Sequence, residues 1–353
     1  MPVITRRTAL AASMFTFVRQ ILSPLALCES APLKETEMQS TPQRPLLSDE
    51  QSTKVIHAVA NSFRQQPRAP ILGTPADVNL EYEDVTFPSE DGVPLEAWFI
   101  PKKGSKKLII ANHPRYFNRW GFPSNIEPWR SMFAAGGNDF EVNLLPDYGI
   151  LHEADYNVLT YDLRNFGHSG DANGSLCTSG HYESRDVIGS MAYAQSRPDL
   201  QQMTIGLFSR CLGCNSTLIA MARKPEVFAH VRCLVGVQPV SARVILERIL
   251  ELAGVPPSRF GDLDQAVKMV TSLPLEEMSP LNASKEVSVP TFLYQVHDDL
   301  LTRPTDVQAM FDDIPIKDKK LFWITGTTRR WDGYTYFSKN PAQMLAWFNK
   351  HMS

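Results

Sequence analysis

The sequence predicts an α/β fold: a mostly parallel sheet with helices on both faces. Short apolar runs of β type alternate with longer stretches of helical periodicity, which is typical of strands joined by covering helices. The turn at residues 89–92, Ser-Glu-Asp-Gly, separates the first two apolar runs and predicts a hairpin, so this edge of the sheet should be antiparallel. The eight predicted strands are residues 79–87, 95–100, 108–111, 158–161, 204–208, 233–237, 291–296 and 321–324.

Helices are predicted between these strands, and two insertions interrupt the alternation. Apolar residues recur at helical spacing between residues 182 and 196, a second helix follows the strand at 204–208, and residues 341–351 form a terminal helix. The insertion at 115–155 carries several aromatic residues, and the one at about 242–285 is predicted to contain two or three short helices. Insertions of this kind lie above the carboxyl ends of the strands, so residues 242–285 are predicted to form a small helical lid.

Residues 1–45 are predicted to be a targeting segment and linker, and residues 46–353 a single folded domain. Arg6 and Arg7 precede a small and apolar run, and no acidic residue occurs before Glu29, as in a twin-arginine export signal. A mitochondrial presequence shares both features. The third interpretation is a peripheral tail on a cytoplasmic protein.

The composition excludes several classes of function. The net charge of −3 at pH 7 provides no basic field for nucleic acid, and no apolar run reaches the roughly 20 residues of a membrane-spanning helix. Glycine-rich phosphate-binding spacing is absent from the sequence, and the Cys211–Cys214 pair is accompanied by no second Cys-x-x-Cys and no paired histidines, so neither a cofactor nor a metal is expected. The predicted partner is therefore a small-molecule substrate, while the oligomeric state is not determined.

The segment at 209–213, Ser-Arg-Cys-Leu-Gly, lies between the strand at 204–208 and the following helix. A nucleophile at such a junction, with small residues two positions away on both sides, is the pattern of a nucleophile elbow. The helix directs its N-terminal N–H groups at the nucleophile. Cys211 is therefore the candidate nucleophile, its thiolate favoured by the helix N-terminus and by nearby cations such as Arg210. The alternative interpretation is a buried, inert thiol.

Two further motifs accompany the elbow. Residues 162–170 read Asp-Leu-Arg-Asn-Phe-Gly-His-Ser-Gly, and residues 108–114 read Leu-Ile-Ile-Ala-Asn-His-Pro. With the elbow, they resemble the α/β-hydrolase superfamily in its Asp-x-Arg-Gly-x-Gly-x-Ser loop after the fourth strand and its oxyanion loop after the third. The resemblance covers most of residues 46–353, and the cysteine at the elbow is similar to dienelactone hydrolases and to cysteine-bearing thioesterase or acyltransferase members. It implies the α/β-hydrolase fold but says little about substrate.

The resemblance also implies roles for individual residues. Cys211 would attack a carbonyl carbon, and the backbone N–H groups of Leu212 and Arg115 would stabilise the oxyanion, because Pro114 has no N–H. The acid is expected after the seventh strand, where Asp299 is preferred over Asp298. The residues expected to contact the substrate are Tyr116, Trp120, Arg329, Trp331 and Tyr334.

The histidine that should follow the last strand is missing. Residues 325–334 contain Arg329 and Arg330 but no histidine, and a guanidinium does not accept a proton. One explanation is that another histidine serves as base; His297 is the first candidate, and the others are His113, His168 and His181. A second is that Arg329 or Arg330 holds the thiolate by charge, which favours acyl transfer, lyase or isomerase chemistry over fast hydrolysis. A third is a degenerate hydrolase that only binds a small molecule or a partner.

The sequence thus predicts a cysteine-dependent hydrolase or acyltransferase acting on an ester, thioester or related carbonyl substrate. The alternative is a catalytically degenerate member of the fold that acts as a binding module.

Overall fold

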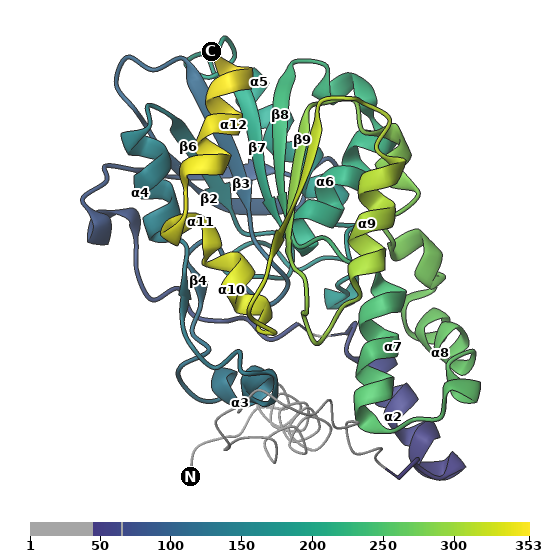
Figure 1. The fold of residues 1–353 in the computed structure, drawn as a ribbon. Coiled ribbons are helices and arrows are strands. Elements are labelled where there is room, and N and C mark those ends of the chain that lie inside the picture. Colours follow the sequence, from purple (N-terminus) through teal and green to yellow (C-terminus); the bar gives the residue numbers. More distant parts are fainter. Residues whose placement is uncertain (1–44, 65) are drawn as a thin grey trace.

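A computed structural model describes residues 45–64 and 66–353, so the predicted targeting segment lies outside the described residues except for Pro45. The core is an eight-stranded sheet in the order β1-β2-β6-β3-β7-β8-β9-β10 (Figure 1). β2 is antiparallel to β1 and to β6, and the remaining neighbours are parallel. The strands are β1 (Glu83–Pro88), β2 (Pro94–Ile100), β3 (Lys107–Asn112), β6 (Asn157–Tyr161), β7 (Thr204–Arg210), β8 (Val231–Val237), β9 (Thr291–Val296) and β10 (Lys319–Ile324).

The observed strands confirm the predicted sheet, including its antiparallel edge. The largest difference lies in the first strand, predicted from residue 79 but starting at Glu83. The cause is a 3-10 helix at Pro75–Val78, which ends at Asn79 in the left-handed conformation with φ of 59°. Asparagine tolerates that conformation better than most residues, and a residue in it does not continue into a strand.

Helices cover both faces because successive strand residues point to opposite sides. In β3, Leu108 and Ile110 join the apolar core on one face, and Ile109 and Ala111 join the core on the other. One face is covered by α4 (Leu145–Glu153), α10 (Arg330–Tyr334), α11 (Tyr336–Lys339) and α12 (Ala342–Met352), and the other by α5 (Ser184–Ser196), α6 (Leu212–Arg223) and α9 (Pro304–Asp313).

A third apolar core lies beneath the lid. Helices α7 (Ala242–Ala253) and α8 (Asp262–Thr271) occupy the predicted lid, and α2 (Asp49–Asn61), far away in sequence, packs against them (Figure 1). Sequence analysis missed α2, although its start carries a capping box: Gln51 N donates to Ser48 Oγ at 3.3 Å, and Ser48 N donates to Gln51 Oε1 at 3.0 Å. The lid is therefore built from the first helix of the domain and from an insertion about 200 residues later in the chain.

The insertion at 115–155 forms a small substructure beside the sheet. It contains the short strands β4 (Gly121–Phe122) and β5 (Val142–Asn143), the helix α3 (Trp129–Phe133) and, at its end, α4. The 3-10 helices of the described chain, besides Pro75–Val78, are Ala134–Gly136, Asn173–Ser175, Pro225–Phe228, Pro257–Arg259, Leu275–Met278 and Ala283–Glu286. None of the described helices combines the length and the apolarity that crossing a bilayer requires.

Candidate active site

Cys211 occupies the turn between β7 and α6. Its φ of 47° and ψ of −110° lie outside the regions that non-glycine residues normally adopt, which is the strained backbone expected of a nucleophile elbow. Gly213 is required by close packing, because a Cβ there would lie 2.1 Å from Asn112 Oδ1. Ser209 stands where the elbow pattern has glycine, and its hydroxyl is accommodated by a hydrogen bond with Thr217 Oγ1 of α6 at 2.9 Å.

The loop after β3 lies against the N-terminus of α6. Gly213 N donates to His113 O at 3.2 Å, which ties the two segments together. Within the described part of the chain, the backbone N–H groups of Leu212 and Arg115 donate to no protein acceptor. Both residues line the same cavity as Cys211. Two unpaired N–H groups beside a nucleophile are what a developing oxyanion requires.

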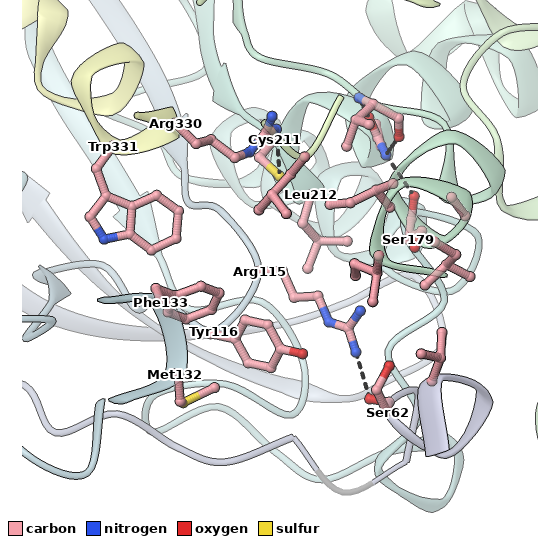
Figure 2. Close-up of a pocket in the computed structure, with 18 of the residues that line it drawn as sticks. Ser62, Arg115, Tyr116, Met132, Phe133, Ser179, Cys211, Leu212, Arg330 and Trp331 are labelled. Carbon is pink, nitrogen blue, oxygen red and sulfur yellow. Dashed lines mark hydrogen bonds between the residues drawn. The ribbon is translucent and has the colours of Figure 1, made fainter. Parts of the chain in front are cut away.

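Arg330 contacts the sulfur of Cys211. It is the first residue of α10, in the segment that follows β10, and its Nη2 lies 3.5 Å from Cys211 Sγ (Figure 2). Nη1 donates to Asp299 Oδ2 at 2.5 Å, while Asp299 Oδ1 accepts from Leu301 N at 3.0 Å. Arg330 therefore stands between the sulfur and the carboxylate, where the resemblance predicts a histidine.

Additional hydrogen bonds hold the Arg330 guanidinium in place. Its Nη2 donates to Gln238 O at 2.7 Å, and its Nε donates to the Tyr334 hydroxyl at 2.8 Å. The side chains of Arg330 and Asp299 are only 3% and 1% exposed, so water barely screens their interaction. All three guanidinium nitrogens are thus engaged, which orients the positive charge toward the sulfur.

The charge states around Cys211 follow from this packing. Burial disfavours the charge on Arg330, but the neighbouring Tyr334, Asp299 and Cys211 groups outweigh burial and hold the Arg330 pKa well above its ordinary value. Burial likewise raises the pKa of Tyr334 well above its ordinary value, against the opposing effect of Arg330. At neutral pH the guanidinium stays charged and the phenol stays protonated, so neither side chain accepts a proton.

None of the eight histidines, all within the described residues, lines the cavity at Cys211. His297, the first candidate for the base, lies away from this cavity: its ring lies against Trp323, and its Nδ1 is 2.7 Å from the exposed Asp298 carboxylate. Asp298, the second candidate for the acid, has a side chain that is 61% exposed and pairs with His297 rather than with a group beside Cys211.

The other candidate histidines are also engaged elsewhere. His113 Nε2 accepts from Leu163 N at 2.9 Å, which leaves its Nδ1 proton to be donated to Pro114 O at 2.7 Å. Burial lowers the pKa of His113 to about 4, so its ring is neutral and both nitrogens are occupied. His181 lies 3.8 Å from Glu277, and His168 is exposed.

A cavity of about 180 Å³ opens beside Cys211, which is itself 9% exposed. Figure 2 shows Arg115, Tyr116 and Trp331 around it. The predicted contact residues Tyr116, Trp331 and Tyr334 line it. Sequence analysis missed the rest of the wall, which comes mainly from the lid, α2 and α3: Ala58, Val59, Ser62, Met132, Phe133, Ser179, Asn215, Val240, Ala242, Ile245, Leu246, Ile249 and Leu301.

Two predicted contact residues lie outside this cavity. Trp120 is 3% exposed and packs in the core with α4, and its backbone N donates to Asn118 Oδ1 at 3.0 Å. Arg329 is 48% exposed and pairs with Asp332 at 2.9 Å. Arg210 was expected to support the thiolate, but its guanidinium pairs with Asp147 in the core instead.

The described cysteines offer no second reactive centre. Cys177, Cys214 and Cys233 are buried free thiols, and burial raises the pKa of each. Cys214 lies in α6 against Gly236, where a Cβ would meet its sulfur at 2.8 Å. Among the described residues, no group of three or more His, Cys, Asp or Glu side chains is placed to hold a metal ion.

Comparison with solved structures bears on the fold. The chain is similar to the esterase Pf2001 of Pyrococcus furiosus, with a TM-score of 0.61 and 20% identity over 82% of this chain and 98% of that one. It is similar to the α/β hydrolase GrgF from Penicillium sp. sh18, with a TM-score of 0.54 and 18% identity over 77% and 99%. No protein-family model and no curated protein sequence matches the chain.

Identities at this level show the fold and leave activity to be argued from the site. The strand order with its antiparallel β2, the elbow between β7 and α6, and the likeness to these structures agree with one another. The chain has the α/β-hydrolase fold.

Proposed function

We propose that this protein is a cysteine-dependent enzyme that accepts an acyl group from an ester or thioester and passes it to an acceptor. One observation carries the proposal: Cys211 sits at a strained elbow on a cavity, with the charged Arg330 guanidinium 3.5 Å from its sulfur and Asp299 behind that guanidinium. A cation in contact with the sulfur and the N-terminus of α6 both favour the thiolate, which is the nucleophilic form of cysteine.

The first step forms an acyl-cysteine. The Cys211 sulfur attacks the carbonyl carbon, a C–S bond forms, and the carbonyl oxygen takes the negative charge. The unpaired N–H groups of Leu212 and Arg115 support this charge. Collapse of the intermediate then breaks the bond to the leaving group, which departs with its electron pair.

Because no described group beside Cys211 can act as a general acid or base, only some classes of substrate are expected to react. Arg330 and Tyr334 hold their protons tightly, and no described histidine lines the cavity. A leaving group that is stable as an anion needs no general acid, which favours thioesters and aryl esters over alkyl esters. The same lack slows attack by water on the acyl-cysteine, so an acceptor that is already nucleophilic, such as a thiol or an amine, is favoured over hydrolysis.

Intact-protein mass spectrometry with p-nitrophenyl hexanoate tests the proposal. We expect a burst of about one p-nitrophenolate per chain and a hexanoyl adduct that maps to Cys211. C211A should show neither, while C214A, which changes the neighbouring buried thiol, is the matched control and should retain both. Cysteamine should then shorten the lifetime of the adduct more than an equal concentration of water-soluble alcohol does.

The absence of both the burst and the adduct would contradict the proposed function. A folded wild-type protein that gives no burst and no adduct is not an acyl-transfer enzyme of this kind. That outcome would favour the alternative function, a module that binds a small molecule or a partner on this fold without turning it over.

A further inference from the structure

The cavity wall contains a cation without a carboxylate partner. The Arg115 guanidinium donates through Nε to Gln66 Oε1 at 3.1 Å and through Nη2 to Ser62 O at 2.6 Å, at the C-terminal end of α2 (Figure 2). Both acceptors are neutral. Among the described residues no ion pair includes Arg115, and three of its five N–H donors remain unused.

The other charged groups nearby are already satisfied. Arg330, the second cation of the wall, is paired with Asp299. The Glu183 carboxylate accepts hydrogen bonds from Thr178 N, Thr178 Oγ1 and Gly180 N, each at 2.9 Å, and forms no ion pair with Arg115. The Arg115 guanidinium is therefore a cation of the cavity wall that no carboxylate of the described residues contacts directly, although Glu183 and Cys211 act on it at longer range.

A second unused donor lies beside this charge. The guanidinium carbon of Arg115 is 4.7 Å from the centre of the Tyr116 ring, and the Tyr116 hydroxyl makes no hydrogen bond within the described residues. Figure 2 shows the two polar ends next to each other at the cavity. The rest of the lining is largely apolar and includes Val59 of α2 and Ile245 and Leu246 of α7. Burial opposes the charge on Arg115, but Tyr116, Cys177, Glu183 and Cys211 outweigh burial and hold the Arg115 pKa above its ordinary value, so the unused N–H donors belong to a charged guanidinium that can pair with an anion.

We propose that the Arg115 guanidinium and the Tyr116 hydroxyl bind a carboxylate at the far end of the substrate's acyl chain. The substrate is then a monoester or monothioester of a dicarboxylic acid. Guanidinium and carboxylate match as a planar, charge-assisted pair. Arg115 would meet the substrate twice, since its backbone N–H lies at the acyl carbonyl and its side chain ends at α2, so the acyl chain should be comparable in length to an arginine side chain.

This inference rests on the proposed acylation of Cys211, and a pair of esters tests it. Mono-p-nitrophenyl adipate and p-nitrophenyl hexanoate have equal acyl length and differ in the terminal carboxylate. We expect wild-type protein to be acylated about 10- to 100-fold faster by the adipate ester. R115Q should reduce this ratio to near one. R68Q, which removes an arginine that pairs with Asp171 outside the cavity, should keep it.

Using the ratio separates recognition from general damage, because any change in folding or in the oxyanion site affects both esters. Equal acylation rates in wild type, or an unchanged ratio in R115Q, overturn the inference while the proposed function stands. If neither ester acylates Cys211, the proposed function fails. Calorimetric binding of monomethyl adipate to C211A then decides the subsite by itself: binding that C211A/R115Q loses supports it, and no binding to C211A overturns it.

Discussion

Two buried arginine–aspartate pairs adjoin Cys211 and differ in what they do. Arg210 precedes Cys211 in β7 and pairs with Asp147 at 2.6 Å, and Arg330 contacts the sulfur and pairs with Asp299 at 2.5 Å. All four side chains are at most 3% exposed. Only the second pair reaches the cavity. The same kind of ion pair is thus part of the core when its arginine lies within a strand, and part of the site when its arginine lies beyond the carboxyl end of the sheet.

The completeness of hydrogen bonding also differs between the pairs. The three nitrogens of the Arg330 guanidinium each have a partner, whereas Arg210 Nε and the nearby Tyr294 hydroxyl have none within the described residues. Arg210 instead stacks on Phe208, with its guanidinium carbon 3.9 Å from the ring centre. The Arg210–Asp147 pair therefore contributes to core packing but leaves buried polar atoms without a hydrogen bond. The Arg330–Asp299 pair holds a positive charge beside the Cys211 sulfur.

Removing Arg210 from the Arg210–Asp147 pair should have the largest effect on stability. R210M leaves the Asp147 carboxylate buried without a partner, so we expect the free energy of unfolding to fall by about 3–5 kcal/mol. Urea denaturation followed by circular dichroism measures this change. The double variant R210M/D147L, which replaces both charges with apolar groups, should recover most of the loss. A double variant as unstable as R210M would show that the ion pair itself stabilises the fold.

The same pair should make stability depend on pH. Burial raises the pKa of Asp147 from 3.8 to about 6, against the opposing effect of Arg210. The folded state therefore holds this proton more tightly than the unfolded state. Between about pH 4 and pH 6 stability should fall as pH rises, by at most about 3 kcal/mol in total. Asp186, whose pKa burial raises to about 7, adds a similar slope, so the measurement is the difference between wild type and D147N. Identical pH profiles for the two proteins would contradict this expectation.

Much of the scaffold could be predicted because its signals are local. The strands appear as short apolar runs, and the elbow is recognisable from the five residues 209–213, although the contact that requires Gly213 is made with Asn112 of β3. The position of α2 over the cavity depends instead on packing against α7 and α8, about 200 residues later in the chain. Its capping box predicts where the helix starts but does not indicate which part of the domain the helix packs against.

The site was harder to predict because neighbouring residues point in different directions. Sequence analysis placed two arginines after the last strand, and only the start of α10 determines that Arg330 turns inward while Arg329 stays exposed. His297 is a candidate for the base because it adjoins two acidic residues in the sequence. Its backbone N donates to Ile324 O, and its ring faces Trp323 outside the cavity. Adjacency in sequence is a weak guide to adjacency in space at the end of a strand.

Replacing the positioning arginine by histidine should change the fate of the acyl group. R330H places an imidazole beside Asp299 and Cys211, where it can take a proton from water. General-base catalysis of this kind typically contributes at least about 100-fold, so we expect hydrolysis of the acyl-cysteine to accelerate by about that factor. Single-turnover decay of the hexanoyl adduct, followed by mass spectrometry, measures it. An adduct as long-lived as that of wild type would mean that the missing base does not limit water attack.

The smallest expected effect concerns the sulfur itself. R330M removes the cation from Cys211, and the loss of a charge-assisted contact should slow alkylation by iodoacetamide at pH 6 by about tenfold. R329M is the matched control, because Arg329 pairs with Asp332 outside the cavity, and it should react like wild type.

The pH dependence distinguishes the loss of charge from structural damage. If Arg330 acts by favouring the thiolate, the difference between R330M and wild type should narrow in alkaline buffer, where cysteine ionises without assistance. A difference that persists at every pH points to altered access to the sulfur. Equal rates at pH 6 would show that Arg330 does not sustain a reactive thiolate, and the two arginine–aspartate pairs would then both be structural.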